Sequence, residues 1–141
     1  MSGPVQRLFV PLAVTQSVGL AVGMVALRLV SITAGVGLLF GGQVAGALWW
    51  FARMGRSSPA ALHRLQTIRT ACVRSGATQG LLTALMYGSW AMTASPEALG
   101  GASIPLGTLA VGLAVLAGGA GSALIAADIA RGWFPEPEAE P

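Results

Sequence analysis

The sequence predicts an all-α integral membrane protein, a bundle of four transmembrane helices with both termini in the cytoplasm. Apolar residues make up 54 % of the 141 residues and charged residues only 9 %, whereas a soluble domain carries roughly 25 % charged residues. The charges are also grouped, because five of the eight basic residues lie within residues 53–74, between long uncharged runs. The 20 glycines suit close contact between helices in lipid.

The first two predicted spans cover residues 8–27 and 29–52. A run of about 20 apolar residues is long enough to cross a hydrocarbon core of about 30 Å. One helix over both runs would extend roughly 67 Å, too far for one crossing, so we predict a tight turn near Arg28. A first helix lying in the membrane plane is the alternative, although such a helix needs a charged face.

The connector after the second span predicts a further helix. Residues 49–51, Trp-Trp-Phe, end that span where an aromatic belt would lie. Ser58 before Pro59 indicates a helix start, with a hydroxyl at the N-cap and proline at the first helical position. Leu62, Leu65 and Ile68 are then spaced toward one face. This helix either lies along the membrane surface or runs directly into the third span.

The third and fourth predicted spans cover residues 75–94 and 106–127, and they complete a membrane domain over residues 1–134. Ser-Pro-Glu at residues 95–97 ends the third span, and the fourth is built almost wholly from Ala, Gly, Leu and Val. The tail at residues 135–141 is acidic and rich in proline, so we expect it to be disordered.

The basic residues predict the orientation. Arg7, the connector arginines and Arg131 fall on one side of a four-span arrangement, and Arg28 falls on the other. The positive-inside rule then places both termini and the connector in the cytoplasm of a multi-pass inner-membrane protein. Because these arginines flank apolar spans, the high pI does not indicate nucleic acid as a partner.

Glycines spaced four residues apart predict positions of close helix packing. They are Gly19 and Gly23, Gly37 and Gly41, Gly42 and Gly46, and Gly76 and Gly80. A glycine-rich chain produces some such pairs by chance, so we assign packing faces to the second span and leave the other pairs open. At about 100° per residue, the glycines of the second span occupy more than one side of the helix. One side can pack within the bundle, which leaves the other for a partner.

Gln16 and Gln43 are read as the only strongly polar side chains near the middle of the membrane. Counted along antiparallel helices from Arg28, they lie at similar depth and can meet. They form either a polar ligand site or an interhelical hydrogen bond worth about 0.6–2 kcal/mol. We favour the hydrogen bond, and we expect leucine at either position to cost little stability.

The remaining chemical groups predict no catalytic, metal or cofactor site. Asp128 borders the fourth span three residues before Arg131, which favours a local ion pair at the membrane interface. His63 is the only histidine and has no cysteine or second histidine at ligand spacing. The methionines Met24, Met86 and Met92 are possible soft copper ligands, but scattered methionines are more often core filler.

Residues 27–92 show a resemblance to a known family. They read LRLVSITAGVGLLFGGQVAGALWW, then a basic connector with SSPAAL, then GATQGLLTALMYGSWAM. This pattern resembles the small predicted integral membrane proteins related to the copper-resistance D family, in which an arginine-rich connector joins two such spans. Those proteins commonly carry a histidine early in the matching span. Here residues 30–32 read Val-Ser-Ile, so the expected metal or haem ligand is missing.

These observations favour a non-catalytic structural or accessory subunit of a larger membrane complex, for example a bioenergetic one. Its expected partners are the lipid bilayer and the other protein subunits of that complex. The alternative is a small transporter or a copper-handling membrane protein. A proton-coupled carrier would require an acid or a histidine in mid-span, and the predicted spans contain neither.

Overall fold

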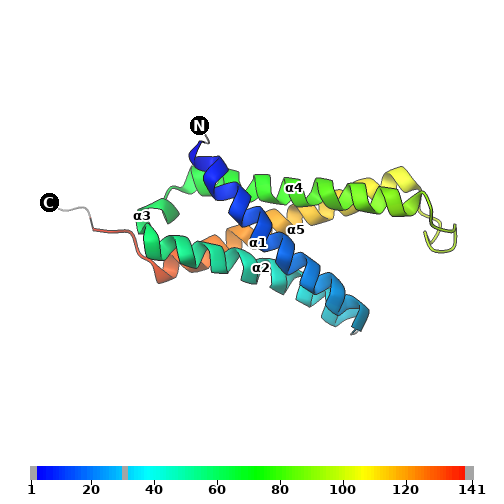
Figure 1. Cartoon of the computed structure of the whole chain (residues 1–141), viewed down its shortest axis with the longest axis horizontal. Helices are drawn as coiled ribbons and strands as arrows, with labels where there is room; N and C mark the ends of the chain where they lie inside the picture. The colour runs from blue at the N-terminus through cyan, green and yellow to red at the C-terminus, as the bar shows by residue number, and fades with distance from the viewer. Residues whose placement is uncertain (1–2, 30–31, 139–141) are drawn as a thin grey trace.

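The computed structural model describes residues 3–29 and 32–138 and contains five helices in that part of the chain (Figure 1). They are α1 (Pro4–Leu29), α2 (Ile32–Ser57), the short α3 (Pro59–Leu62), α4 (Leu65–Ala91) and α5 (Ile104–Trp133). The described residues form no strand, so the predicted all-α class is confirmed.

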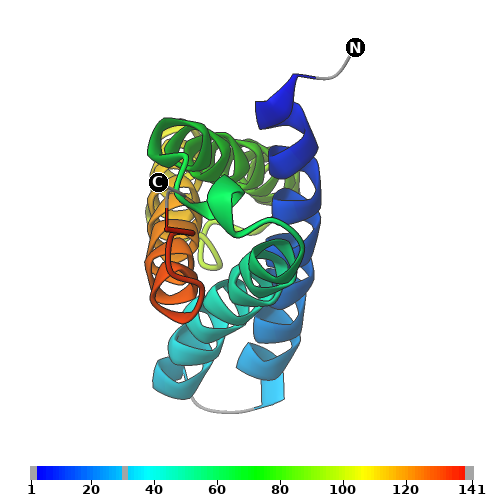
Figure 2. The same ribbon diagram turned by 90° about the vertical axis from the view of Figure 1, so that its left-hand side faces the viewer.

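The long helices form two antiparallel hairpins, α1–α2 and α4–α5, which pack together with α1 against α4 and α2 against α5. Viewed along the bundle, α3 lies over one end, between the ends of the long helices (Figure 2). The start of α1 and the end of α5 lie near α3, whereas the far ends of the two hairpins splay apart (Figure 1). The hairpins therefore cross, and they are closest at the end that holds α3.

Glycines bring the backbones of α1 and α2 together. Gly19 faces the Gly42 carbonyl, and Gly46 faces the Thr15 carbonyl on the opposite helix. A methyl group added at Gly23 would lie 2.7 Å from Leu39 Cα, closer than real contacts allow. Without these glycines the two helices would have to move apart.

Glycines also bring the backbones of α4 and α5 together. A methyl group added at Gly76 would lie 2.5 Å from the Leu116 carbonyl oxygen, and one at Gly80 would lie 2.5 Å from that of Gly112. Six of the eight glycines predicted for packing therefore sit at interhelical contacts. The other two, Gly37 and Gly41, have open space where a side chain would be.

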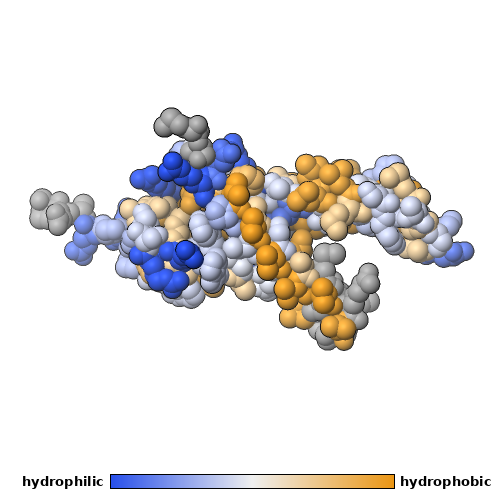
Figure 3. Space-filling view, in the orientation of Figure 1, coloured by the Kyte–Doolittle hydropathy of each residue, from blue (hydrophilic) through white to orange (hydrophobic). Residues whose placement is uncertain are grey.

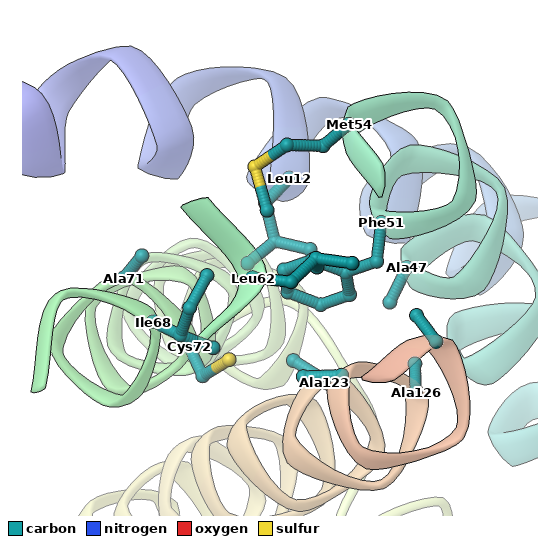
Figure 4. Close-up of a cluster of buried hydrophobic side chains, with 12 residues drawn as sticks. Leu12, Ala47, Phe51, Met54, Leu62, Ile68, Ala71, Cys72, Ala123 and Ala126 are labelled. Atoms are coloured by element: carbon teal, nitrogen blue, oxygen red, sulfur yellow. The ribbon is translucent and has the colours of Figure 1, made fainter. Parts of the chain in front are cut away.

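A hydrophobic cluster fills the end of the bundle beside α3 (Figure 4). It combines Leu12, Phe51, Leu62 and Ile68 with alanines of α5. Phe51 was expected in an aromatic belt but is fully buried. It fills the space at the meeting point of all five helices, where alanines leave room for one large ring.

Many large hydrophobic side chains lie exposed on the outer surface. On α1, Val10, Val14, Val18 and Val22 form a stripe, each 48–63 % exposed, which Figure 3 shows as an orange line across the molecule. Two segments are long and apolar enough to cross a membrane, Pro4–Gly23 and Ile104–Trp133. Only 17 % and 22 % of their apolar windows are buried, whereas the core helix of a soluble protein is mostly buried. These two helices indicate a membrane protein.

Helix boundaries differ from the predicted spans at the connector. The helix that starts at Pro59 stops after Leu62, and α4 begins at Leu65, so α4 runs from the connector directly into the predicted third span. The break changes the helical phase, and Leu65 is exposed while Leu62 and Ile68 are buried. The prediction of one continuous face was therefore wrong. Ser58 is the N-cap residue, but its side chain makes no capping hydrogen bond.

Two predictions concern residues that the structure describes only in part. Helix α1 continues through Arg28 to Leu29 and α2 begins at Ile32, so the predicted turn concerns residues 30–31, which lie outside the described ranges. In the predicted disordered tail, residues 135–138 form no helix or strand, and residues 139–141 lie outside the described part.

Candidate functional site

A cluster of polar side chains lies at the centre of the bundle, with at least one member from each long helix. Each member is at most 4 % exposed. The members are Gln16 of α1, Gln43 of α2, Ser75 and Gln79 of α4, and Ser122 of α5. We call these five residues the amide cluster. Since α1 and α4 belong to different hairpins, as do α2 and α5, the cluster joins the two hairpins.

Gln16 is the hub of the amide cluster. Its Nε2 donates to the Gly119 carbonyl oxygen at 2.9 Å and to Ser122 Oγ at 3.2 Å. Its Oε1 accepts from Ser75 Oγ at 2.6 Å and from Gln79 Nε2 at 3.1 Å. One side chain of α1 thus holds α4 through its oxygen and α5 through its nitrogen.

These contacts fix the orientation of both amides. The Gly119 carbonyl can only accept, so the Gln16 nitrogen must face it and the Gln16 oxygen must face α4. Gln79 must then turn its own nitrogen toward that oxygen, and the same nitrogen also lies 3.2 Å from Ser75 Oγ. As a result, Gln79 Oε1 is buried without a hydrogen bond partner.

Gln43 joins the amide cluster through Ser122. The Ser122 hydroxyl lies 3.2 Å from Gln43 Oε1 and 2.6 Å from the carbonyl oxygen of Gly118 in its own helix. The Gly119 carbonyl oxygen lies 3.2 Å from the same hydroxyl. A hydroxyl has one hydrogen to donate, so the three acceptors compete for it. The link to Gln43 is therefore weaker than the four contacts of Gln16.

Sequence reasoning found part of this cluster. Gln16 and Gln43 do lie in one polar network, bridged by Ser122. Gln79 was not among the residues singled out from the sequence, yet it is buried like these two and bonds directly to Gln16. Ser75 and Gln79 are four residues apart and so share one helix face, a signal in the sequence that could have identified them.

The chemistry of the amide cluster is that of neutral donors and acceptors. Amides and hydroxyls make directional hydrogen bonds but do not take up or release protons near neutral pH. Between helices in lipid such bonds contribute about 0.6 kcal/mol each on average. The cluster can thus fix the pairing of the hairpins and can bind a polar group through an unused donor or acceptor.

A second polar group lies at the end of the bundle that holds α3. Arg131 forms an ion pair with Asp128, and its Nε donates to the Leu62 carbonyl oxygen at 2.9 Å. His63 Nε2 lies 2.9 Å from the Phe134 carbonyl oxygen, which requires a hydrogen on that nitrogen. These contacts attach α3 to the end of α5. Asp128 remains largely exposed, as expected for a carboxylate at an interface.

The methionines differ from the expectation of core filler. Met86 of α4 and Met92, the C-cap residue that follows α4, are exposed. Of the described methionines, only Met54 belongs to the hydrophobic cluster. The side chain of Met24 lies outside the described part of the structure. Among the described residues, no group of three or more histidine, cysteine, aspartate or glutamate side chains is placed to hold a metal ion.

Comparison with protein-family models, with curated proteins and with solved structures finds no match for this chain. The resemblance to the copper-resistance D family therefore stays a prediction, carried by residues 27–92 alone.

Proposed function

We propose that all four long helices cross the inner membrane and that the protein is a structural or accessory subunit of a larger membrane complex. The observation that carries the proposal is an open stripe of small residues on the outside of α2. It consists of Gly37, Gly41 and Ala45, all exposed, and we call it the outer stripe.

The packing of the bundle supports four crossings. The two apolar candidates, α1 and α5, each lie alongside both α2 and α4. All four helices have 26 to 30 residues, roughly 39–45 Å at 1.5 Å per residue. If α1 and α5 cross the bilayer, α2 and α4 must lie in it as well.

The charge distribution supports cytoplasmic termini. The α3 end of the bundle carries Arg7 at the start of α1, the connector arginines, and Arg131 at the end of α5. Hydrophilic surface gathers around this end, and apolar surface occupies the middle (Figure 3). The positive-inside rule assigns such an end to the cytoplasm.

The outer stripe supports a helical partner. Helices in lipid associate through close backbone contact, which small residues at a spacing of four allow. On the opposite side of α2, Gly42 and Gly46 already contact α1. Gly37 and Gly41 have the same spacing but no neighbour within 4 Å of an added methyl group. A transmembrane helix of another subunit fits this surface.

Two adjacent glycines provide a matched test. Gly41→Leu should leave the fold intact, because its side chain enters open space. On native gels of gently solubilised membranes, the wild-type protein should run as a larger species, and Gly41→Leu should run at the size of the single chain. Gly42→Leu should instead destabilise the bundle, because its side chain would enter the Gly19 backbone. A wild-type protein that is already monomeric, or a Gly41→Leu variant that keeps its partner, would exclude the subunit role.

A further inference from the structure

Arg74 is an exposed arginine of α4 that lies level with the amide cluster. The residue that follows it, Ser75, donates to Gln16 Oε1. Gln16 lies nine residues after Arg7, roughly 13 Å further along α1. Because α1 and α4 both start at the α3 end of the bundle (Figure 1), the backbone of Arg74 lies well inside the level of Arg7. In the four-span arrangement proposed above, this backbone is therefore at the depth of the lipid.

The charge of Arg74 has no opposite charge beside it in the described part of the chain. Over residues 3–29 and 32–138, the one ion pair joins Arg131 to Asp128. A charged side chain in lipid is costly unless it reaches water or a counter-charge. The long arginine side chain can extend from its helix toward the membrane surface. The anions at that level of a bilayer are the phosphates of the lipid headgroups.

An apolar path continues from Arg74 along the same face of α4. Leu81 and Leu85 lie seven and eleven residues after it. At about 100° per residue, both fall within about 20° of Arg74 around the helix axis. Their side chains are 63 % and 60 % exposed. A cation followed by exposed apolar side chains on one face fits an amphiphile with an anionic head.

We propose that Arg74 binds the phosphate of an anionic phospholipid in the cytoplasmic leaflet, with an acyl chain along Leu81 and Leu85. Arginine suits this role because its planar guanidinium can donate two parallel hydrogen bonds to a phosphate. An acidic protein in the cytoplasm would match the charge but not the apolar path. The inference rests on the proposed crossing of α4 but not on a partner subunit, because the outer stripe lies on α2.

Native mass spectrometry of the full chain in detergent tests the proposal with two phospholipids. Dioleoylphosphatidylglycerol and dioleoylphosphatidylcholine are offered together in equal amounts. Both have the same acyl chains and a phosphate, but the choline cation cancels the charge of the second lipid. One arginine near the surface favours an anionic lipid about fivefold, so the phosphatidylglycerol adduct of the wild-type protein should exceed the phosphatidylcholine adduct by at least that factor. Equal adducts on the wild-type protein, or no adduct, would overturn the proposal.

Two exposed arginines of α4 provide a matched comparison. Arg74→Gln removes the proposed phosphate ligand, and the preference for phosphatidylglycerol should fall about fivefold. Arg69→Gln removes the same charge from an exposed position. The residues seven and eleven after Arg69 are Gly76 and Gly80, which pack against α5, so no exposed apolar path follows it and most of the preference should remain. Equal losses in the two variants would indicate a general attraction to surface charge and would refute the site.

A water-soluble competitor distinguishes a phospholipid from a free phosphate compound. Glycerophosphoglycerol presents the phosphatidylglycerol headgroup without acyl chains, and in equal amount it should not reduce the lipid adduct. Displacement of the lipid by this compound would exclude a phospholipid as the ligand. Gly41→Leu, which tests the partner subunit, should leave the lipid preference of the chain unchanged. The lipid site and the subunit role can therefore fail separately.

Discussion

Replacement of Gln16 by leucine should destabilise the bundle much more than the same change at Gln43. Gln16 makes four hydrogen bonds to α4 and α5, whereas a single contact, to Ser122, joins Gln43 to the amide cluster. At about 0.6 kcal/mol for each bond in lipid, the loss is about 2–3 kcal/mol for Gln16→Leu and about 0.6 kcal/mol for Gln43→Leu. The sequence alone led us to expect little loss from leucine at either position, and the four bonds of Gln16 replace that expectation for this residue.

Reversible unfolding in mixed micelles of increasing denaturing detergent measures both values, with helix content followed by circular dichroism. The difference corresponds to roughly a ten- to fiftyfold difference between the two unfolding equilibrium constants. Gln16→Leu combined with Gln79→Leu should lose less than the sum of the single changes, because the two amides bond to each other. Equal losses for Gln16→Leu and Gln43→Leu would refute the hub role of Gln16.

Two further predictions test the position of the chain in the membrane and the integrity of its core. Reporter fusions at Arg56, Ala98 and Glu136 should report inside, outside and inside, and an outside signal at Arg56 would overturn the four-span topology. The Cys72 thiol is fully buried beside α5, so a maleimide should label it only at the rate of unfolding. Rapid labelling of the folded protein would show that the hydrophobic cluster is open.

The helical class and the pairing of helices were predictable because they depend on local patterns. Long uncharged runs set the helices, and the short links between them favour antiparallel neighbours. The glycine pair Gly42 and Gly46 marked a contact face on α2, because small residues four apart allow helix backbones to approach closely. The termination of α3 after Leu62 was not predictable in this way, since it depends on Arg131 from the far end of the chain bonding the Leu62 carbonyl.

The membership of the amide cluster was harder to predict than its existence. Gln79 lies only five residues after Arg74 and so reads as near the membrane surface. In the structure α4 begins ten residues before the predicted span, at Leu65, and packs beside α1 so that Gln79 reaches Gln16. The depth of a residue in the bundle depends on the offset between neighbouring helices along their axes. No sequence pattern within α4 specifies that offset.

The same geometry explains why the hairpins pair and why a cavity opens between them. In lipid, apolar side chains gain little free energy by moving from contact with lipid tails to contact with another helix. Helix pairing therefore depends on close packing and hydrogen bonds. Glycines allow close backbone packing within each hairpin, whereas the described contacts between α1 and α4 are made by side chains. These are the hydrophobic cluster near α3 and then the amide cluster. The hairpins diverge toward their far ends (Figure 1), and Gln79 lines a cavity of about 640 Å³ between α1 and α4. Gln79 therefore takes part both in a bond between the hairpins and in the wall of that cavity.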